Sequence, residues 1–76
     1  MLNKKEIYFL KAFNDDICIT KDINGRVFLT KDRPVLDETL GEWHKADFIE
    51  LEPEYFKNLS WKRAYFSKQL LAEAGQ

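Results

Sequence analysis

The sequence predicts a small α+β domain, and three observations lead to this class. Two runs of β-branched and aromatic residues flank an Asn-Gly pair and predict a β-hairpin over residues 17–31. Helix-start and helix-stop signals follow later in the chain, at Pro53 and over residues 60–75. No repeat, low-complexity tract or linker divides the 76 residues. We therefore expect a single domain over residues 1–76, with one to three short helices packed on an antiparallel sheet of three or four strands.

The first element, over residues 6–13, is ambiguous between helix and strand. Asn3 and Glu6 have the spacing of a capping box, which favours a helix. The Ile, Tyr and Phe residues of this segment favour a strand, and residues 14–16 would supply a turn into the hairpin. The capping box gives a slight preference for the helix.

The hairpin is the clearest local signal. Asn24 and Gly25 both tolerate positive φ, so we expect a two-residue type I′ turn between the strands. Because side chains alternate along a strand, one face is mostly β-branched or apolar, and we expect it to meet the core. Its members are Ile17, Ile19 and Lys21 on the first strand and Val27, Leu29 and Lys31 on the second; Cys18, Thr20, Phe28 and Thr30 lie opposite.

Proline positions organise the middle of the chain. Pro34 cannot donate to a ladder, so the second strand should end near Arg33, with a loop over residues 37–41. Residues 43–51 predict another strand, with Glu50 and Glu52 as charges that protect an exposed sheet edge. Pro53 at a first helical position predicts a short helix through about residue 59.

The final segment, residues 60–75, predicts a helix that begins with Ser60 as its N-cap and ends at Gly75. The alternative is that residues 61–66 pair with the sheet and only the tail is helical. The aromatic residues of this stretch are compatible with either arrangement.

Composition indicates a folded protein of the cytoplasm. A net charge of −1 with 45% hydrophobic residues argues against disorder. Cys18 is the only cysteine, which excludes an intramolecular disulfide and fits a reducing compartment. We expect no membrane partner, because no apolar run of about 20 residues and no secretory signal occur.

Charge is distributed unevenly along the chain. Residues 32–56 carry eight acidic residues against Arg33 and Lys45, whereas residues 57–76 carry four basic residues against Glu73. The simplest interpretation is two solvated faces of one domain. An acidic surface that occupies another protein's nucleic-acid site is an alternative.

Catalysis, metal binding and cofactor binding are not expected. Cys18 and His44 are the only thiol and imidazole, they lie on separate expected strands, and a structural zinc site needs about four such ligands. The paired acidic residues have no EF-hand spacing, and no Gly-rich loop precedes a helix. We therefore predict a protein that is not an enzyme and takes no cofactor.

The aromatic content predicts a binding surface. Eleven Phe, Trp and Tyr residues exceed what so short a chain can bury in one core. Aromatic and Arg side chains dominate binding hot spots. We therefore predict a protein-protein interaction module that binds another protein or a second copy of itself, with contacts at Trp61, Arg63, Tyr65 and Phe66.

Nucleic-acid binding is the alternative function, through residues 57–68. This stretch has no acidic residue, and Trp61 or Tyr65 could stack on a base. The phosphate contacts would come from Lys57, Lys62, Arg63 and Lys68.

Over residues 17–62 the order of short motifs resembles that of small uncharacterised proteins of bacteriophages and prophages. In those proteins a strand, an Asp-Gly or Asn-Gly turn, a second strand, a Lys-Pro-Val segment, a Gly-x-Trp and a Phe-Pro-x-Leu-x-Trp follow one another. The corresponding stretches here are residues 20–29, 31–35, 41–43 and 55–62, with Lys57 where the pattern has proline. The resemblance implies a small accessory or regulatory protein that works by binding, and it implies no activity.

Overall fold

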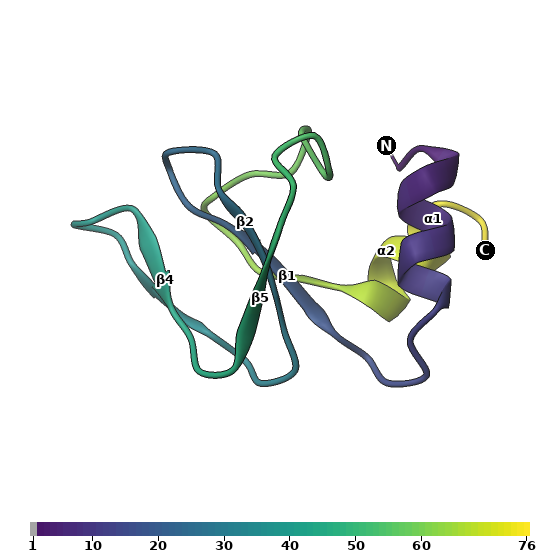
Figure 1. The fold of residues 1–76 in the computed structure, drawn as a ribbon, viewed down its shortest axis with the longest axis horizontal. Helices are drawn as coiled ribbons and strands as arrows, with labels where there is room; N and C mark the ends of the chain where they lie inside the picture. The colour runs from purple at the N-terminus through teal and green to yellow at the C-terminus, as the bar shows by residue number, and fades with distance from the viewer. Residues whose placement is uncertain (1) are drawn as a thin grey trace.

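The β1–β2 hairpin lies at the centre of the fold, and strands from later in the chain flank it. The computed structural model describes residues 2–76. Strands β1 (Cys18–Lys21), β2 (Val27–Thr30), β5 (Phe48–Leu51) and β6 (Tyr65–Phe66) form an antiparallel sheet in the order β5-β2-β1-β6. Strands β3 (Val35–Asp37) and β4 (Glu42–His44) form a second, two-stranded sheet. Helices α1 (Lys4–Lys11) and α2 (Ser67–Glu73) lie together at one end of the molecule (Figure 1). The α+β prediction is confirmed.

Helix α1 begins at the predicted capping box. Asn3 Oδ1 accepts from the Glu6 N–H at 2.8 Å, and Glu6 Oε1 accepts from the Asn3 N–H at 2.9 Å. Two N–H groups that lack helical partners are thereby satisfied. The ambiguity over residues 6–13 is resolved in favour of the helix.

The hairpin is present, but its turn differs from the predicted type I′ turn. The Gly25 N–H donates to the Asp22 carbonyl and the Asp22 N–H to the Arg26 carbonyl, both at 2.9 Å. Gly25 has φ +92°, whereas Asn24 does not have positive φ. The loop therefore has three residues, with a Gly in the bulge position. Asn24 Oδ1 accepts from the Arg26 N–H at 3.0 Å instead of adopting the left-handed conformation.

The three-residue loop sets a register that separates the two faces. Ile19 lies opposite Leu29, and Cys18 lies opposite Thr30. A two-residue loop would place Ile19 opposite Thr30 and would mix the faces.

Both faces of the hairpin are buried. The expected core face packs against residues of α1, α2 and the segment after β5; this cluster is Leu10, Ile17, Ile19, Val27, Leu29, Phe56 and Leu70. The opposite face, with Cys18, Thr20 and Thr30, is also buried, because β4 contacts β1 and brings Trp43 into the interior. A buried second face was not expected from the sequence.

Residues 43–51 form two strands, and the prediction of one strand is wrong. Asp47 has φ +46° and separates β4 from β5. Strand β4 pairs with β3, whereas β5 pairs with β2. The predicted loop over 37–41 is the connection between β3 and β4, where Asp37 Oδ1 accepts from the Thr39 and Leu40 N–H groups at 3.0 and 3.2 Å.

The predicted helix after Pro53 is absent, since residues 53–59 form turns. Phe56 has φ +56°, and its side chain is only 2% exposed. Its N–H donates to Glu6 Oε2, a carboxylate 50 residues earlier in the chain. This long-range bond and the burial of the Phe56 ring outweigh the local helix signals.

The C-terminal segment follows the predicted alternative in part. Of residues 61–66, only 65–66 pair with β1, whereas 61–63 form a turn and a bend, and only the tail is helical. The helix begins at Ser67 and not after Ser60, because Asp16 Oδ1 accepts from Ser67 Oγ at 3.1 Å and from the Lys68 N–H at 3.0 Å. Gly75, with φ +79°, ends the helix as predicted.

Gly41 supports the contact between the two hairpins, and its replacement should be costly. Gly41 has φ +68°, and a Cβ there would lie 2.5 Å from Ile23 Cγ2. We expect Gly41→Ala to lower the free energy of unfolding by roughly 2–4 kcal/mol, from backbone strain plus overpacking. Gly25→Ala, with nothing within 4 Å of its Cβ, should cost only about 1 kcal/mol. Urea denaturation measures the unfolding free energy of both variants. Equal losses would contradict the close approach of Ile23 as the cause of the larger cost at Gly41.

Glu6 should be the most sensitive acidic residue. Its side chain is 5% exposed and both carboxylate oxygens accept backbone N–H groups, from Asn3 and Phe56. Because glutamine has one acceptor oxygen, Glu6→Gln leaves one of these groups without an acceptor, and we expect a loss of about 1–3 kcal/mol in unfolding free energy. Exposed Glu73→Gln is the matched control, with an expected change within about 0.5 kcal/mol.

Candidate interaction surface

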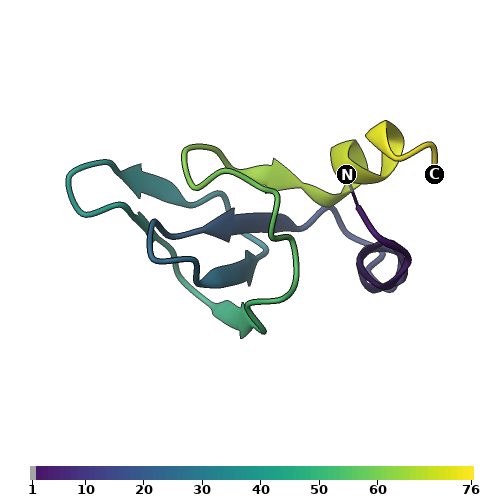
Figure 2. The ribbon, with the colours of Figure 1, turned by 90° about the horizontal axis from the view of Figure 1, so that it is seen from above.

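Strand β5 is an edge strand with exposed apolar side chains. No described strand pairs with its outer side, and Figure 2 shows β5 and β6 at opposite edges of the sheet. Ile49 is 61% exposed and Phe48 is 51% exposed. The sequence prediction of an exposed edge near Glu50 is confirmed for this strand.

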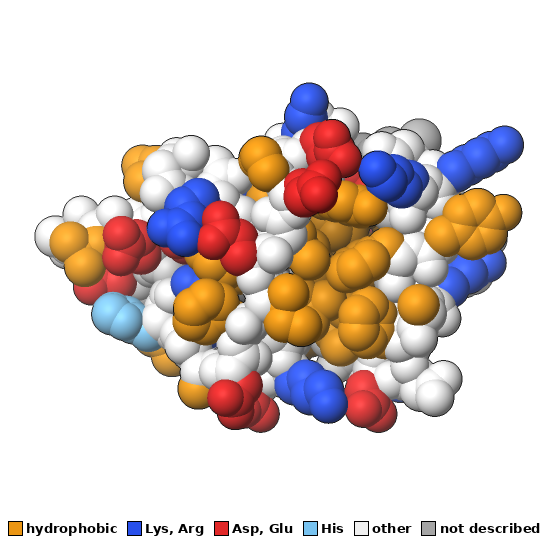
Figure 3. Space-filling view, viewed as in Figure 1, with side chains coloured by type: hydrophobic (Ala, Val, Ile, Leu, Met, Phe, Trp, Pro, Cys, Tyr) orange, Lys and Arg blue, Asp and Glu red, His pale blue; other side chains and the backbone are white. Residues whose placement is uncertain are grey.

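The helix side of β5 continues into a wider apolar area. Ile49 lies opposite Leu29, and Leu51 lies opposite Val27, so both point to the helix side of the sheet. Figure 3 shows a broad hydrophobic area between β5 and α1. Its aromatic members pack on one another, with Phe9 5.3 Å from Phe13 and 5.7 Å from Tyr55 between ring centroids. We call this area the β5 surface; it comprises Phe9, Phe13, Ile49, Leu51 and Tyr55.

The other side of β5 is held by aromatic and cationic contacts. Phe48 meets Phe28 edge to face, with ring centroids 5.3 Å apart at 86°. Lys45 Nζ lies 3.9 Å from the Phe28 centroid and 5.1 Å from that of Phe48. These contacts fix the strand, although half of Phe48 is left in solvent.

Acidic residues frame the strand. Residues 46–54 contain Asp47, Glu50, Glu52 and Glu54 and no Lys or Arg. Two of the four are paired: Arg26 donates to both Glu50 oxygens at 3.0 and 2.6 Å, and Lys5 donates to Glu54 at 3.2 Å. These hydrogen bonds hold the pKa of the Glu50 and Glu54 carboxyls below their ordinary values. No ion pair within residues 2–76 involves Asp47 or Glu52.

The contact residues predicted from the sequence lie at the opposite edge, around β6. Trp61, Tyr65 and Phe66 are half-buried, and Arg63 is exposed. The Trp61 carbonyl accepts from Trp43 Nε1 at 2.9 Å, and the Tyr65 hydroxyl accepts from the Ser60 N–H at 3.0 Å. The structure brings Arg63 and Tyr65 together, with the guanidinium carbon 4.6 Å from the ring centroid.

The four cations predicted for nucleic-acid binding are exposed but do not form one cluster of contacts. Lys62 lies 5.8 Å from the Trp61 ring centroid, and Arg63 covers the Tyr65 ring. Lys57 follows Phe56 in the turn, where its carbonyl accepts from Lys21 Nζ at 2.8 Å. Lys68 lies in the first turn of α2, beside Asp16.

Cys18 and His44 lie in different sheets, and no hydrogen bond joins them within residues 2–76. Cys18 is buried in β1, and burial raises the pKa of its thiol. His44 is exposed in β4, with Nε2 3.3 Å from Asp37 Oδ2. Within residues 2–76, no group of three His, Cys, Asp or Glu side chains is placed to hold a metal ion.

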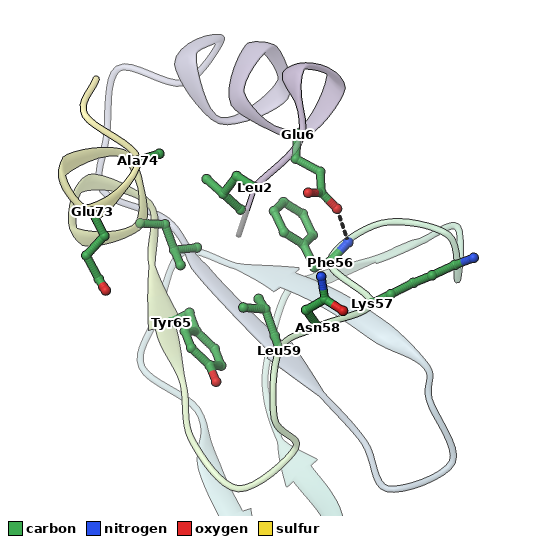
Figure 4. Close-up of a pocket in the computed structure, with 10 residues that line it drawn as sticks. Leu2, Glu6, Phe56, Lys57, Asn58, Leu59, Tyr65, Glu73 and Ala74 are labelled. Carbon is green, nitrogen blue, oxygen red and sulfur yellow. Dashed lines mark hydrogen bonds between the residues drawn. The ribbon is translucent and has the colours of Figure 1, made fainter.

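A cavity of about 220 Å³ lies between α1, α2 and the turn after β5 (Figure 4). Its walls are largely apolar, with Leu2, Phe56, Leu59 and Leu70 among them. Glu6 reaches its edge, but both carboxylate oxygens are already engaged by backbone N–H groups. The cavity offers no unsatisfied buried group for a ligand among the residues drawn.

Glu50 and Glu52 predicted the exposed edge, but the sequence did not identify Ile49 and Phe48 as exposed side chains. Their exposure depends on the sheet order, which only the fold reveals.

No helix in residues 2–76 is long and apolar enough to cross a membrane.

Comparison of the chain with known protein families, curated proteins and solved structures found no match.

The Arg26–Glu50 pair should contribute to acid sensitivity. The hydrogen bond from Arg26 lowers the pKa of Glu50. A carboxyl whose pKa is lower in the folded state than in the unfolded state stabilises the fold at pH values above its unfolded-state pKa. This stabilisation is lost as the pH falls through the folded-state pKa. We therefore expect Glu50→Gln to be less stable than the wild type at neutral pH, with a difference that shrinks below the ordinary glutamate pKa. Urea denaturation from neutral pH to below the ordinary glutamate pKa measures this difference, with exposed Glu38→Gln as the control. A difference in unfolding free energy between wild type and Glu50→Gln that is constant with pH would contradict the prediction.

Proposed function

We propose that this chain is a non-enzymatic protein-protein interaction module that binds through the β5 surface and the outer edge of β5. The observation that carries the proposal is the exposure of Ile49, at 61%, on an edge strand beside half-buried aromatic side chains. Contiguous exposed apolar area on a small protein is typical of interaction sites.

The edge supports a particular mode of binding. An edge strand presents backbone N–H and C=O groups that an extended partner segment can pair with, while alternate side chains give specificity. Here Ile49 and Leu51 would contact a partner on the helix side of the sheet, and Phe48 on the other side. The acidic residues around the strand favour a partner that carries positive charge.

The remaining parts of the proposal concern chemistry and location. A buried Cys18 and an exposed His44 in a different sheet support a protein that uses neither for catalysis. The single buried thiol also supports a reducing compartment, and we propose the cytoplasm. The resemblance to phage and prophage proteins supports an accessory or regulatory role.

Nucleic-acid binding through Lys57, Lys62, Arg63 and Lys68 is the second candidate. The exposure of all four cations favours it. The aromatic faces are less accessible, because Lys62 and Arg63 lie over Trp61 and Tyr65. A base would have to displace these cations before it could stack, so we rank this function second.

Affinity capture with matched variants tests the proposed function. Immobilised wild type, Ile49→Lys and Tyr8→Lys are exposed to lysate of cells that natively make the protein. Tyr8 is 74% exposed on α1 and is the control for adding a lysine. We expect proteins that bind the wild type and Tyr8→Lys but not Ile49→Lys, with circular dichroism confirming that all three are folded. The same proteins on all three baits would contradict the proposal.

A further inference from the structure

We infer that the strand received by β5 is β6 of a second copy of this chain, so that the antiparallel sheet continues head to tail from one molecule to the next. This inference rests on the proposed function, because it names the partner for the same edge. Within the described residues, β5 and β6 are the two ends of the sheet, and neither has a second neighbour (Figure 2).

The register of the sheet makes the two edges fit. Across the four strands, Ile49, Leu29, Ile19 and Tyr65 form one row. Phe48, Thr30, Cys18 and Phe66 form the next row, on the opposite face. Each row therefore has an apolar residue at both ends. Continuing the rows into a second copy places Ile49 beside Tyr65 and Phe48 beside Phe66, with no shift in register.

The strand directions also match. Strand β5 is antiparallel to β2, and β6 is antiparallel to β1. Since β1 and β2 are themselves antiparallel, β5 and β6 run in opposite directions. Two copies in the same orientation therefore bring β6 of one antiparallel to β5 of the other.

Backbone groups face outward at the matching positions. The Asp22 N–H donates to the Arg26 carbonyl, so Arg26 directs its backbone groups to β1, and every second residue after it, Phe28 and Thr30, does the same. The residue between them, Leu29, directs its backbone groups to β5. Ile49 faces Leu29, so the backbone N–H and C=O groups of its neighbours Phe48 and Glu50 point away from the sheet. At the other edge, the Ser67 N–H donates to the Ile17 carbonyl, so Ser67 and Tyr65 direct their backbone groups to β1. The backbone groups of Ala64 and the N–H of Phe66 therefore point away from the sheet. These are the residues that the continued rows pair.

Charge favours this pairing over a symmetric one. Residues 46–54 hold four acidic residues and no base, whereas residues 62–68 hold Lys62, Arg63 and Lys68 and no acid. Glu52 follows β5, and Lys62 and Arg63 precede β6, so the antiparallel pairing brings these oppositely charged residues to the same end of the contact. A symmetric β5–β5 contact would instead bring two acidic segments together. Arg33, 5.6 Å from the Phe66 ring centroid, adds a further cation beside β6.

Sedimentation of mixed variants tests the arrangement. Ile49→Lys blocks β5, because the new lysine would replace the apolar contact with Tyr65 of the neighbour and would lie on the same face as Arg63; the double variant Lys62→Glu and Arg63→Glu blocks β6. We expect wild type to form oligomers that grow with concentration up to about 1 mM, because a head-to-tail contact does not close. Each blocked variant alone should be monomeric. An equimolar mixture should give a dimer and nothing larger, since one intact β5 and one intact β6 remain.

The controls separate this inference from the proposed function. Tyr8→Lys should behave as wild type, and Glu52→Lys replaces Ile49→Lys if the latter fails to fold. A wild type that stays monomeric at about 1 mM, or a mixture that stays monomeric, would overturn the head-to-tail pairing. Ile49-dependent capture of a different protein would then leave the proposed function standing. Loss of association in only one of the two blocked variants would indicate a symmetric contact and would also overturn it.

Discussion

The register of the β1–β2 hairpin is the constraint on which the rest of the structure depends. Gly25 adopts φ +92° and closes a three-residue loop, which places Ile19 beside Leu29. A loop shorter by one residue would turn every side chain of one strand to the other face. Because both faces of the hairpin are buried, such a slip would disrupt the helix side and the β4 side together. The same register determines which residues end each row, and therefore what β5 and β6 present at the edges.

Elements whose signals are local were predictable from the sequence. The capping box of Asn3 and Glu6, the hairpin and the stop at Gly75 each depend on contacts within a few residues. The turns over residues 53–59 were not predictable, because the Phe56 N–H bonds a carboxylate from α1. The break at Asp47 was missed for a similar reason: it allows β4 to pair with β3 and β5 with β2, and this choice is made by tertiary contacts.

Amino-acid composition predicted that some aromatic side chains would be exposed, but it did not identify them. The number of aromatic residues predicted that some would stay outside the core, and Phe48 is half in solvent while Tyr8 is 74% exposed. Composition cannot say which ones, because exposure depends on strand order. Trp61, Tyr65 and Phe66 are more buried than Phe48, since Trp61 and Tyr65 take part in the contacts that hold residues 60–66 against the sheet. Their role as partner contacts stays a prediction.

The fold places the acidic and the basic segments of the chain at different edges of the sheet. Segments that are far apart in the sequence form the two edges of one sheet, one acidic and one basic. Like charges along an edge discourage that edge from pairing with a copy of itself. Arg26 and Lys5 compensate Glu50 and Glu54 within the molecule, whereas no ion pair in residues 2–76 involves Asp47 or Glu52. In the proposed pairing, Asp47 and Glu52 would interact with the incoming strand. They would disfavour acidic strands and admit basic ones, so protection of the edge and selectivity would arise from the same side chains.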